Sequence, residues 1–187
     1  NGNPIKQIAH DGSVTFIAYD AKGRETERAT FPSSYQTATT RPALANATRV
    51  VSTKWHATWM LPTQTAEPNK TTANTYNSKG MLTGQSWTAT TDATGAAKFS
   101  AVKTGSTYAT GSSYSASSLA TTIVQKVDAV EARRWAFVYN ALGDATKVTA
   151  TEAGTSAVAT LTSSTTHGLL TQLSANNGAL AKFTYNT

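Results

Sequence analysis

The stretch Tyr76-Asn77-Ser78-Lys79-Gly80 has two close counterparts in this chain of 187 residues. An Asp or Asn side chain can stabilise a turn by bonding to the backbone two residues on, and Gly adopts the positive φ that tight turns require. The shared pattern Tyr-[Asp/Asn]-x-x-Gly therefore predicts a recurring turn that follows a tyrosine. The two counterparts are Tyr19-Asp20-Ala21-Lys22-Gly23 and Tyr139-Asn140-Ala141-Leu142-Gly143, and a fourth copy begins at Tyr185-Asn186.

The residues before these tyrosines alternate in character, as in residues 13–19 and 179–185. Alternation with a period of two indicates a half-buried strand. Three of the four residues that stand seven positions before the tyrosines are Gly or Asn, which suit a tight turn. Each copy therefore predicts a strand between two turns, the unit of a β-hairpin. The four positions are Gly12, Asn69, Ala132 and Gly178.

Weaker copies appear at a period of about 21 residues, which is typical of a repeat architecture. Trp55 lies 21 residues before Tyr76, and Gly168 follows Ser164, which lies 21 residues before Tyr185. A looser copy begins at Tyr114. Gly2 stands 21 residues before Gly23, so both ends of the sequence fall inside repeats. We expect residues 1–187 to be a single repeat region and a fragment of a longer chain.

Two insertions interrupt the series, near residues 31–50 and 88–113. The first contains Pro32 and Pro42 among many Thr and Ser residues and is predicted to be a loop. The second contains residues 97–102, which could form an additional strand. The segment Val127–Leu142 has the composition of a short helix, but its alignment with the other repeats favours a strand, because propensity is a weak guide against repeat context.

The composition supports an all-β protein. The chain contains 35 Thr and 17 Ser residues, so 52 of 187 positions carry small hydroxyl side chains. Thr is β-branched and favours strands, whereas Ser competes for backbone hydrogen bonds and favours turns. The chain has no Cys, which excludes disulfide scaffolds, thiol nucleophiles and thiolate metal centres.

The charge distribution and hydropathy exclude two further classes. The net charge is +6, but the basic residues are scattered singly, and only Arg133 and Arg134 are adjacent. A nucleic-acid site usually concentrates its cations on one face, so no nucleic-acid partner is expected. No segment approaches the roughly 20 apolar residues that span a bilayer, so no membrane span is expected.

The recurring Tyr-[Asp/Asn]-x-x-Gly pattern, followed by an apolar residue and Thr, resembles the YD-repeat (Rhs-repeat) family. The resemblance is strongest at residues 9–30, 54–88, 131–150 and 167–187. It implies β-hairpin repeats that coil into a spiralling sheet or part of a hollow barrel or cocoon. In that family such shells encapsulate toxin domains of bacterial toxins or serve as scaffolds of cell-surface proteins. The resemblance thus implies a secreted or cell-surface bacterial protein.

The resemblance also assigns roles to individual residues. It makes Tyr19, Tyr76 and Tyr139 the repeat tyrosines, and it makes the next residue of each copy the one that stabilises the turn. The turn-stabilising residues and turn glycines are Asp20, Asn77 and Asn140, and Gly23, Gly80 and Gly143. Degenerate or truncated copies place Trp55, Gly168, Tyr185 and Asn186 in the same motif.

No catalytic, cofactor or metal site is predicted. Ser100-Ala101-Val102-Lys103 and Lys103-Thr104-Gly105 match two motifs of serine acyl-transfer enzymes, but they share one lysine where those enzymes need two. A metal site would need the separated histidines His10, His56 and His167 to converge with carboxylates such as Asp11, Asp20 or Asp144.

Three roles stay open at this point. The first is a wall segment of a larger repeat shell, with flanking repeats and an enclosed toxin domain as partners. The second is a self-assembling extracellular filament, in which identical copies pair edge to edge. The third is a carbohydrate-binding surface module that presents one or more of the four tryptophans, Trp55, Trp59, Trp87 and Trp135, to a glycan.

Overall fold

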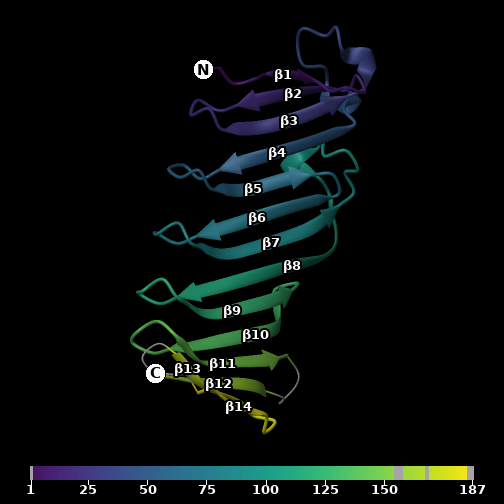
Figure 1. Ribbon diagram of the computed structural model, residues 1–187. Coiled ribbons are helices and arrows are strands. Elements are labelled where there is room, and N and C mark those ends of the chain that lie inside the picture. Colours follow the sequence, from purple (N-terminus) through teal and green to yellow (C-terminus); the bar gives the residue numbers. More distant parts are fainter. Residues whose placement is uncertain (1, 154–157, 167–168, 185–187) are drawn as a thin grey trace. The chain divides into compact units, whose positions relative to one another are not determined.

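The computed structural model describes residues 2–153, 158–166 and 169–184, without side chains for residues 158, 165 and 166. It is all-β, as the sequence predicts, with three short 3-10 helices (Figure 1). The strands are β1 (Lys6–Ile8), β2 (Val14–Tyr19), β3 (Glu25–Phe31), β4 (Arg49–Trp55), β5 (Pro62–Glu67), β6 (Lys70–Tyr76), β7 (Leu82–Thr90), β8 (Lys103–Tyr114), β9 (Ala120–Val127), β10 (Val130–Tyr139), β11 (Ala145–Glu152), β12 (Val158–Thr166), β13 (Leu169–Ala175) and β14 (Leu180–Lys182). The helices are η1 (Ser33–Tyr35), η2 (Leu44–Asn46) and η3 (Lys98–Ser100).

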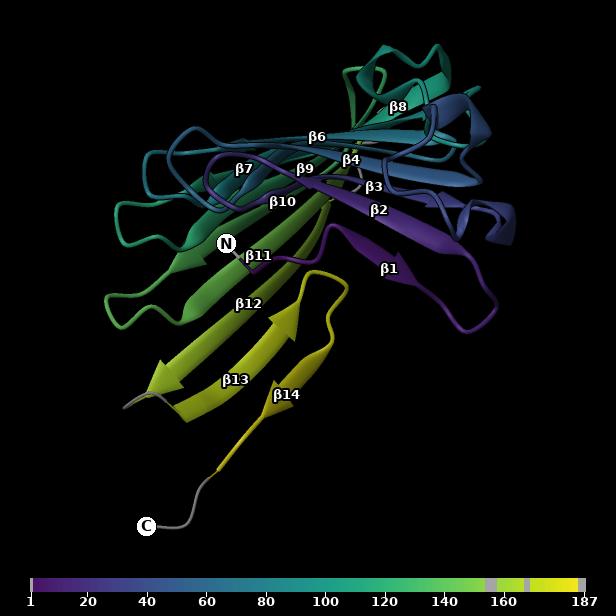
Figure 2. The ribbon, with the colours of Figure 1, turned by 90° about the horizontal axis from the view of Figure 1, so that it is seen from above.

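Strand order in the sheet follows chain order from β1 to β14. Neighbouring strands pair antiparallel, as β2 does with β3 and β12 with β13. In Figure 2 strands β12, β13 and β14 lie side by side in this order. Consecutive antiparallel strands with short connections are hairpins, so the predicted hairpin-repeat architecture is confirmed.

The chain forms two compact units, Asn1–Thr107 and Tyr108–Thr187, which we call the first and second units. In the first unit the loops after β2, β4 and β6 all lie at the same end of the strands (Figure 1). In the second unit the loops after β8 and β10 likewise lie at the same end of the strands. These are the loops that contain the Tyr-[Asp/Asn]-x-x-Gly copies or their variants.

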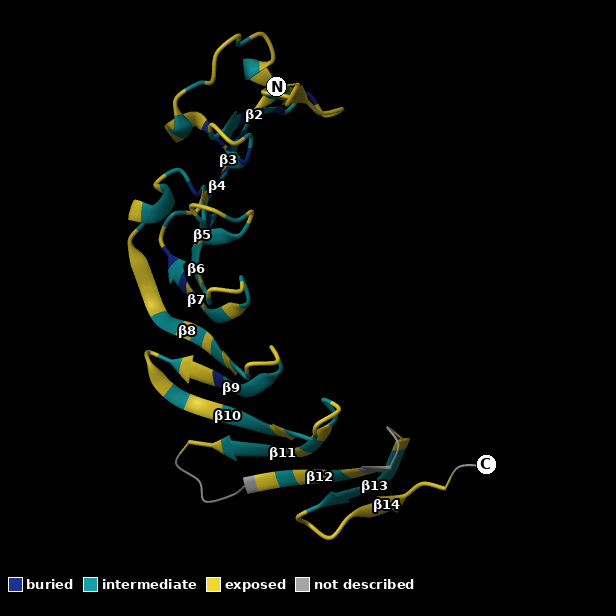
Figure 3. Ribbon diagram, turned by 90° about the vertical axis from the view of Figure 1, so that its left-hand side faces the viewer, coloured by how far each residue is buried: buried dark blue, intermediate teal, exposed yellow. Residues whose placement is uncertain are grey.

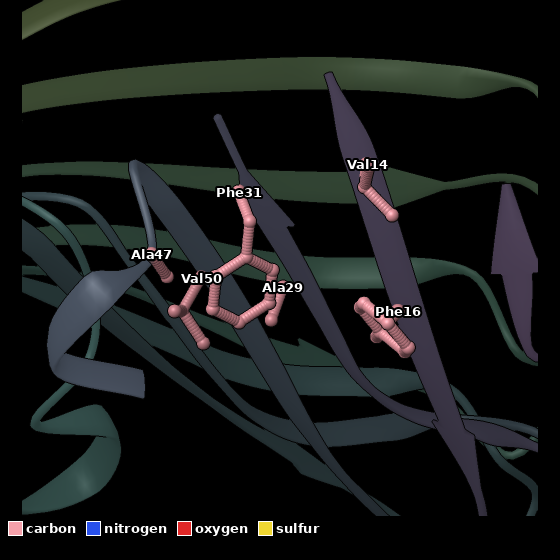
Figure 4. Packing of buried hydrophobic residues seen from close by; sticks show 6 residues of the cluster. All are labelled: Val14, Phe16, Ala29, Phe31, Ala47 and Val50. Carbon is pink, nitrogen blue, oxygen red and sulfur yellow. The ribbon is translucent and has the colours of Figure 1, made fainter. Parts of the chain in front are cut away.

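The first unit contains a hydrophobic core on one face of β2, β3 and β4. Figure 4 shows its six buried side chains, in which the Phe16 and Phe31 rings pack edge to face with centroids 5.8 Å apart. The loop of residues 32–48 covers this face through Tyr35, Ala38 and Leu44, which pack against the core. The first insertion is therefore a loop, as predicted, and it supplies the second layer of the core. The six core residues are Val14, Phe16, Ala29, Phe31, Ala47 and Val50.

Burial is much lower in the second unit (Figure 3). Val124 is the one buried hydrophobic side chain among the described residues of this unit. Most other side chains of its strands are half-buried or exposed. Its strands are therefore held mainly by hydrogen bonds and cross-strand contacts rather than by a covered core.

The structure decides two further sequence predictions. The segment Val127–Leu142 is strand rather than helix, since β10 occupies Val130–Tyr139. The prediction of an additional strand at residues 97–102 is wrong, because η3 occupies part of it and β8 begins only at Lys103. The chain turns there because the Asp92 carboxylate accepts hydrogen bonds from the backbone N–H groups of Gly95 (2.9 Å) and Ala97 (2.7 Å).

Candidate functional site

The first repeat corner lies between β2 and β3 and is built around Asp20. Its Oδ1 accepts hydrogen bonds from the backbone N–H groups of Lys22 (2.9 Å) and Arg24 (3.0 Å). The Asp20 N–H donates to the Arg24 carbonyl (2.9 Å), and the Gly23 N–H donates to the Asp20 carbonyl (2.9 Å). Gly23 has a φ of 77°, a conformation that other residues rarely adopt. The backbone N–H of Arg24 is the main cause that holds the pKa of Asp20 below its ordinary value.

The same bonds recur at Asn77. Its Oδ1 accepts from the N–H groups of Lys79 (2.9 Å) and Met81 (3.0 Å). The Gly80 N–H donates to the Asn77 carbonyl (3.0 Å), and the Asn77 N–H donates to the Met81 carbonyl (3.0 Å). The amide oxygen of Asn77 thus accepts the same two backbone hydrogen bonds as the carboxylate of Asp20.

Asn140 forms the third corner with the same geometry. Its Oδ1 accepts from the N–H groups of Leu142 (2.9 Å) and Asp144 (2.9 Å). The Gly143 N–H donates to the Asn140 carbonyl (3.1 Å), and the φ of Gly143 is 90°. Three segments far apart in the sequence therefore fold into one local structure.

The tyrosine of each corner donates its hydroxyl to the strand before it in the sheet. Tyr76 at the end of β6 bonds the carbonyl of Pro62 at the start of β5 (2.8 Å). Tyr139 at the end of β10 bonds the carbonyl of Ala120 at the start of β9 (2.7 Å). Tyr19 bonds the carbonyl of Pro4 just before β1 (3.0 Å). Each aromatic residue therefore links its own hairpin to the previous one.

A β-bulge lies opposite each corner's aromatic residue, on the strand that follows the corner. The register between paired strands shifts at Ala18/Tyr19, Lys54/Trp55, Thr75/Tyr76, Ser113/Tyr114 and Val138/Tyr139. In each case the extra residue is a threonine of the strand after the corner, as with Thr26 between Glu25 and Glu27. The bulge therefore bends the strand that leaves the corner, opposite the aromatic residue.

Trp55 occupies the tyrosine position of a degenerate corner. Its Nε1 donates to the carbonyl of Glu25 at the start of β3 (2.8 Å), so the link to the previous hairpin is kept. His56 stands in the Asp or Asn position, and its Nδ1 accepts from the N–H groups of Thr58 (3.2 Å) and Trp59 (3.3 Å). The His56 N–H donates to the carbonyl of Leu61, five residues on, whereas the equivalent bond in the other corners spans four residues. This loop is therefore one residue longer.

The loop that follows Tyr114 has serine both at the Asp or Asn position and at the glycine position. The Ser115 Oγ accepts from the Leu119 N–H (3.2 Å), and the Ser118 N–H donates to the Ser115 carbonyl (3.0 Å). Ser118 takes the glycine position with a φ of 65°. The hydroxyl of Ser115 is thus the functional equivalent of the Asp20 carboxylate.

Some predicted motif residues lie elsewhere. Gly168, Tyr185 and Asn186 fall outside the described residues. The expected turn at Ala132 is wrong: Ala132 lies inside β10 beside a register shift between Glu131 and Arg133. The turn lies earlier, at Asp128 and Ala129, which have positive φ values of 50° and 68°. By contrast, Gly12, Asn69 and Gly178 all have positive φ, as predicted.

The residues that suggested chemistry do not converge. Over the described residues no group of three or more His, Asp or Glu side chains is arranged to hold a metal ion. His10 and His56 lie in separate turns, and His167 is outside the described residues. The Ser100 hydroxyl at the end of η3 donates to the carbonyl of Ala97, the residue just before that helix (2.6 Å). No helix in the described part of the chain is long and apolar enough to cross a membrane.

The tryptophans differ in exposure. Trp87 is 38% exposed, and the Lys70 ammonium lies 5.9 Å from its ring centroid. The other three are half-buried. The Trp59 ring stacks on His56 with centroids 4.4 Å apart, so one of its faces is covered. Of the four rings, Trp59 therefore has a covered face and Trp87 is the most exposed.

Comparison with known structures shows that this chain shares its fold with part of another protein. The chain is similar to a part of a crystal structure of TcdB2-TccC3-Cdc42, with 15% sequence identity and a TM-score of 0.68. The match covers 99% of this chain and 9% of the other, so the chain spans less than a tenth of the protein it resembles. The match shows that the two share the fold of their common segment.

Other comparisons add little. A second match is the Tc holotoxin pore of Photorhabdus luminescens with a TccC3 mutation, at 11% identity over 94% of this chain and 11% of that chain. Its TM-score of 0.48 is too low to support an inference. No protein family model matches the sequence, and no curated protein matches it either.

Proposed function

We propose that this chain is a wall segment of a shell built from YD/Rhs-type hairpin repeats, and that it acts as a scaffold rather than as a catalyst. The observation that carries the proposal is the corner that recurs at Asp20, Asn77 and Asn140, each with an aromatic link to the previous hairpin. A corner of this kind lets identical hairpins be added one after another, which is how a repeat protein builds an extended surface.

The sheet order supports the same role. β1 and β14 stand at the two ends of the strand order, and each has only three residues. An edge strand exposes unpaired backbone groups that another strand can cover. In the proposal, neighbouring repeats of a longer chain pair with these two strands and continue the wall.

The fold shared with TcdB2-TccC3-Cdc42 suggests the biological setting. That structure contains TcdB2, TccC3 and Cdc42, and this chain would correspond to a small part of one of its chains. We therefore propose that the complete protein acts outside the cell that makes it and encloses a protein cargo such as a toxin domain. The repeat tyrosines, Asp or Asn residues and glycines are its structural site residues, and the role needs no cofactor.

The test is protease protection of the native protein that contains this chain. The purified particle is digested with a nonspecific protease before and after it is opened with guanidinium, and the fragments are identified by mass spectrometry. We expect a polypeptide other than the wall to resist digestion until the particle is opened. Equal digestion of all parts in the closed state would refute enclosure, and micrographs of continuous fibres would favour the filament instead.

A further inference from the structure

The first unit contains a pocket of about 120 Å³ that the repeat corners do not explain. It lies over strands β5, β6 and β7, on the sheet face against which η3 packs. Phe99 of η3 and Lys103 at the start of β8 line one part of it. The polar side chains that line the sheet face are Gln64, Thr71, Ser86 and Thr88.

The strand register places these four polar side chains on one face of the sheet. Thr71 stands opposite Thr88 in the β6–β7 pair. Ser86 of β7 and Gln64 of β5 both stand opposite Ala73 of β6. Directly opposite residues share a face, and so do residues two apart on one strand, such as Thr71 and Ala73. The polar groups therefore project together from the face that carries the pocket.

Three of the four polar side chains, those of Gln64, Thr71 and Ser86, have no hydrogen-bond partner among the described residues. All three residues are half-buried, and their polar atoms are not among the enclosed side-chain atoms that lack a partner, so these atoms are open to the pocket. Thr88 differs, because it is 5% exposed and its hydroxyl is paired with that of Thr107 (2.8 Å). Thr88 therefore forms the floor of the pocket, and the other three polar groups can face a ligand.

The charge around the pocket is positive. Lys103 is exposed and has no carboxylate partner among the described residues. Lys54 also lacks one there, and its ammonium lies 4.3 Å from the centroid of the Phe99 ring, which lines the pocket. None of the described lining residues is acidic. Glu67 is the one acidic residue of β5, β6 and β7, and alternation places it on the other face, where it pairs with Lys70 (3.8 Å). An anion in the pocket would therefore meet unpaired positive charge and no lining carboxylate.

We infer that this pocket binds a phosphate group, either as the free ion or at the end of a small monoester. The Lys103 ammonium supplies the opposite charge. The Thr71 and Ser86 hydroxyls and the Gln64 amide donate hydrogen bonds to the phosphate oxygens, and bonds to an ionised acceptor are stronger than neutral ones. The volume is well below the roughly 300–1,000 Å³ of drug-sized ligand sites, which suits a small ion. The inference does not rest on the shell role, because none of the lining residues belongs to a repeat corner.

The experiment is an NMR titration of the full chain with inorganic phosphate, methyl phosphate and glycerol, at neutral pH and constant ionic strength. The backbone amide shifts of β5, β6 and β7 report binding. Thr71→Val and Ser86→Ala each remove one lining hydroxyl, and Lys103→Gln removes the lining charge. The matched controls are Thr72→Val and Lys70→Gln, which change β6 on the opposite face of the sheet. A thermal melt of each variant confirms that it is folded.

We expect saturable shifts with at least one of the two phosphates and none with glycerol. Thr71→Val, Ser86→Ala and Lys103→Gln should each weaken binding about tenfold, as expected for the loss of a hydrogen bond to a charged group. The two controls should bind as the original chain does. Binding of methyl phosphate would assign the end of a monoester, and binding of free phosphate alone would assign the ion itself. The inference is wrong if neither phosphate shifts these amides, if glycerol binds as tightly, or if the controls weaken binding as much as the pocket variants.

Discussion

Replacing Asn77 by alanine tests the physical basis of the repeat corner. The substitution removes the two side-chain bonds from the N–H groups of Lys79 and Met81 and leaves the backbone bonds of the turn in place. Each such bond contributes about 0.5–1.5 kcal/mol, and values near the lower end suit a corner that is partly open to water. We expect Asn77→Ala to destabilise the corner by about 1–2 kcal/mol.

Asn77→Asp is the matched variant, because Asp20 accepts the equivalent bonds in the first corner. The assay is amide hydrogen exchange at Lys79 and Met81. A loss of 1–2 kcal/mol should speed local exchange by a factor of about 5–30 in the alanine variant. The aspartate variant should stay near the original rate, and exchange at Leu142 should not change in either. Equal acceleration by Ala and Asp, or none by Ala, would refute the assignment of this side chain as the stabiliser of the turn.

Three further predictions concern the first unit. Phe31→Ala should lower its free energy of unfolding by about 3–5 kcal/mol, measured by urea denaturation, because the ring is fully buried. Gly95→Ala should be severely destabilising, since a Cβ there would lie 2.1 Å from the Val50 carbonyl oxygen, whereas Gly105→Ala meets no atom within 4 Å and should show only the strain of its positive φ in a thermal melt. Burial raises the pKa of Asp92, but backbone N–H bonds from its loop outweigh burial and leave it below the ordinary value. Its stabilising effect should be complete above about pH 4 and be lost as pH falls further, and Asp92→Asn should remove this part of the acid sensitivity in melts at several pH values.

The strands and corners follow from local signals that the sequence carries. Alternation fixes the faces of strands such as β2, and the Asp or Asn with its glycine closes the turn within five residues. The serine corner after Tyr114 shows how far such signals can weaken, because Ser115 and Ser118 replace both key residues and the turn still forms. In the sequence, this corner is indicated only by the distance of Tyr114 from the neighbouring copies of the repeat.

What could not be predicted depends on partners far along the chain. The Tyr76 hydroxyl bonds a backbone carbonyl, and since every residue has a carbonyl, no sequence pattern marks Pro62 as the partner. Glu27 meets Lys98, which is far away in sequence, only after both insertions fold onto the sheet. The turn expected at Ala132 was misplaced because β10 is extended by a bulge.

Cryo-electron microscopy of the native protein that contains this chain is the most direct test of whether the chain forms part of a wall made of hairpin repeats. We expect a hollow particle in which strands β1 to β14 run consecutively through the wall, with other repeats paired to both β1 and β14. Separate density should lie inside. A map in which β1 or β14 pairs with an identical chain in an open fibre, or in which the particle has no interior, would contradict it.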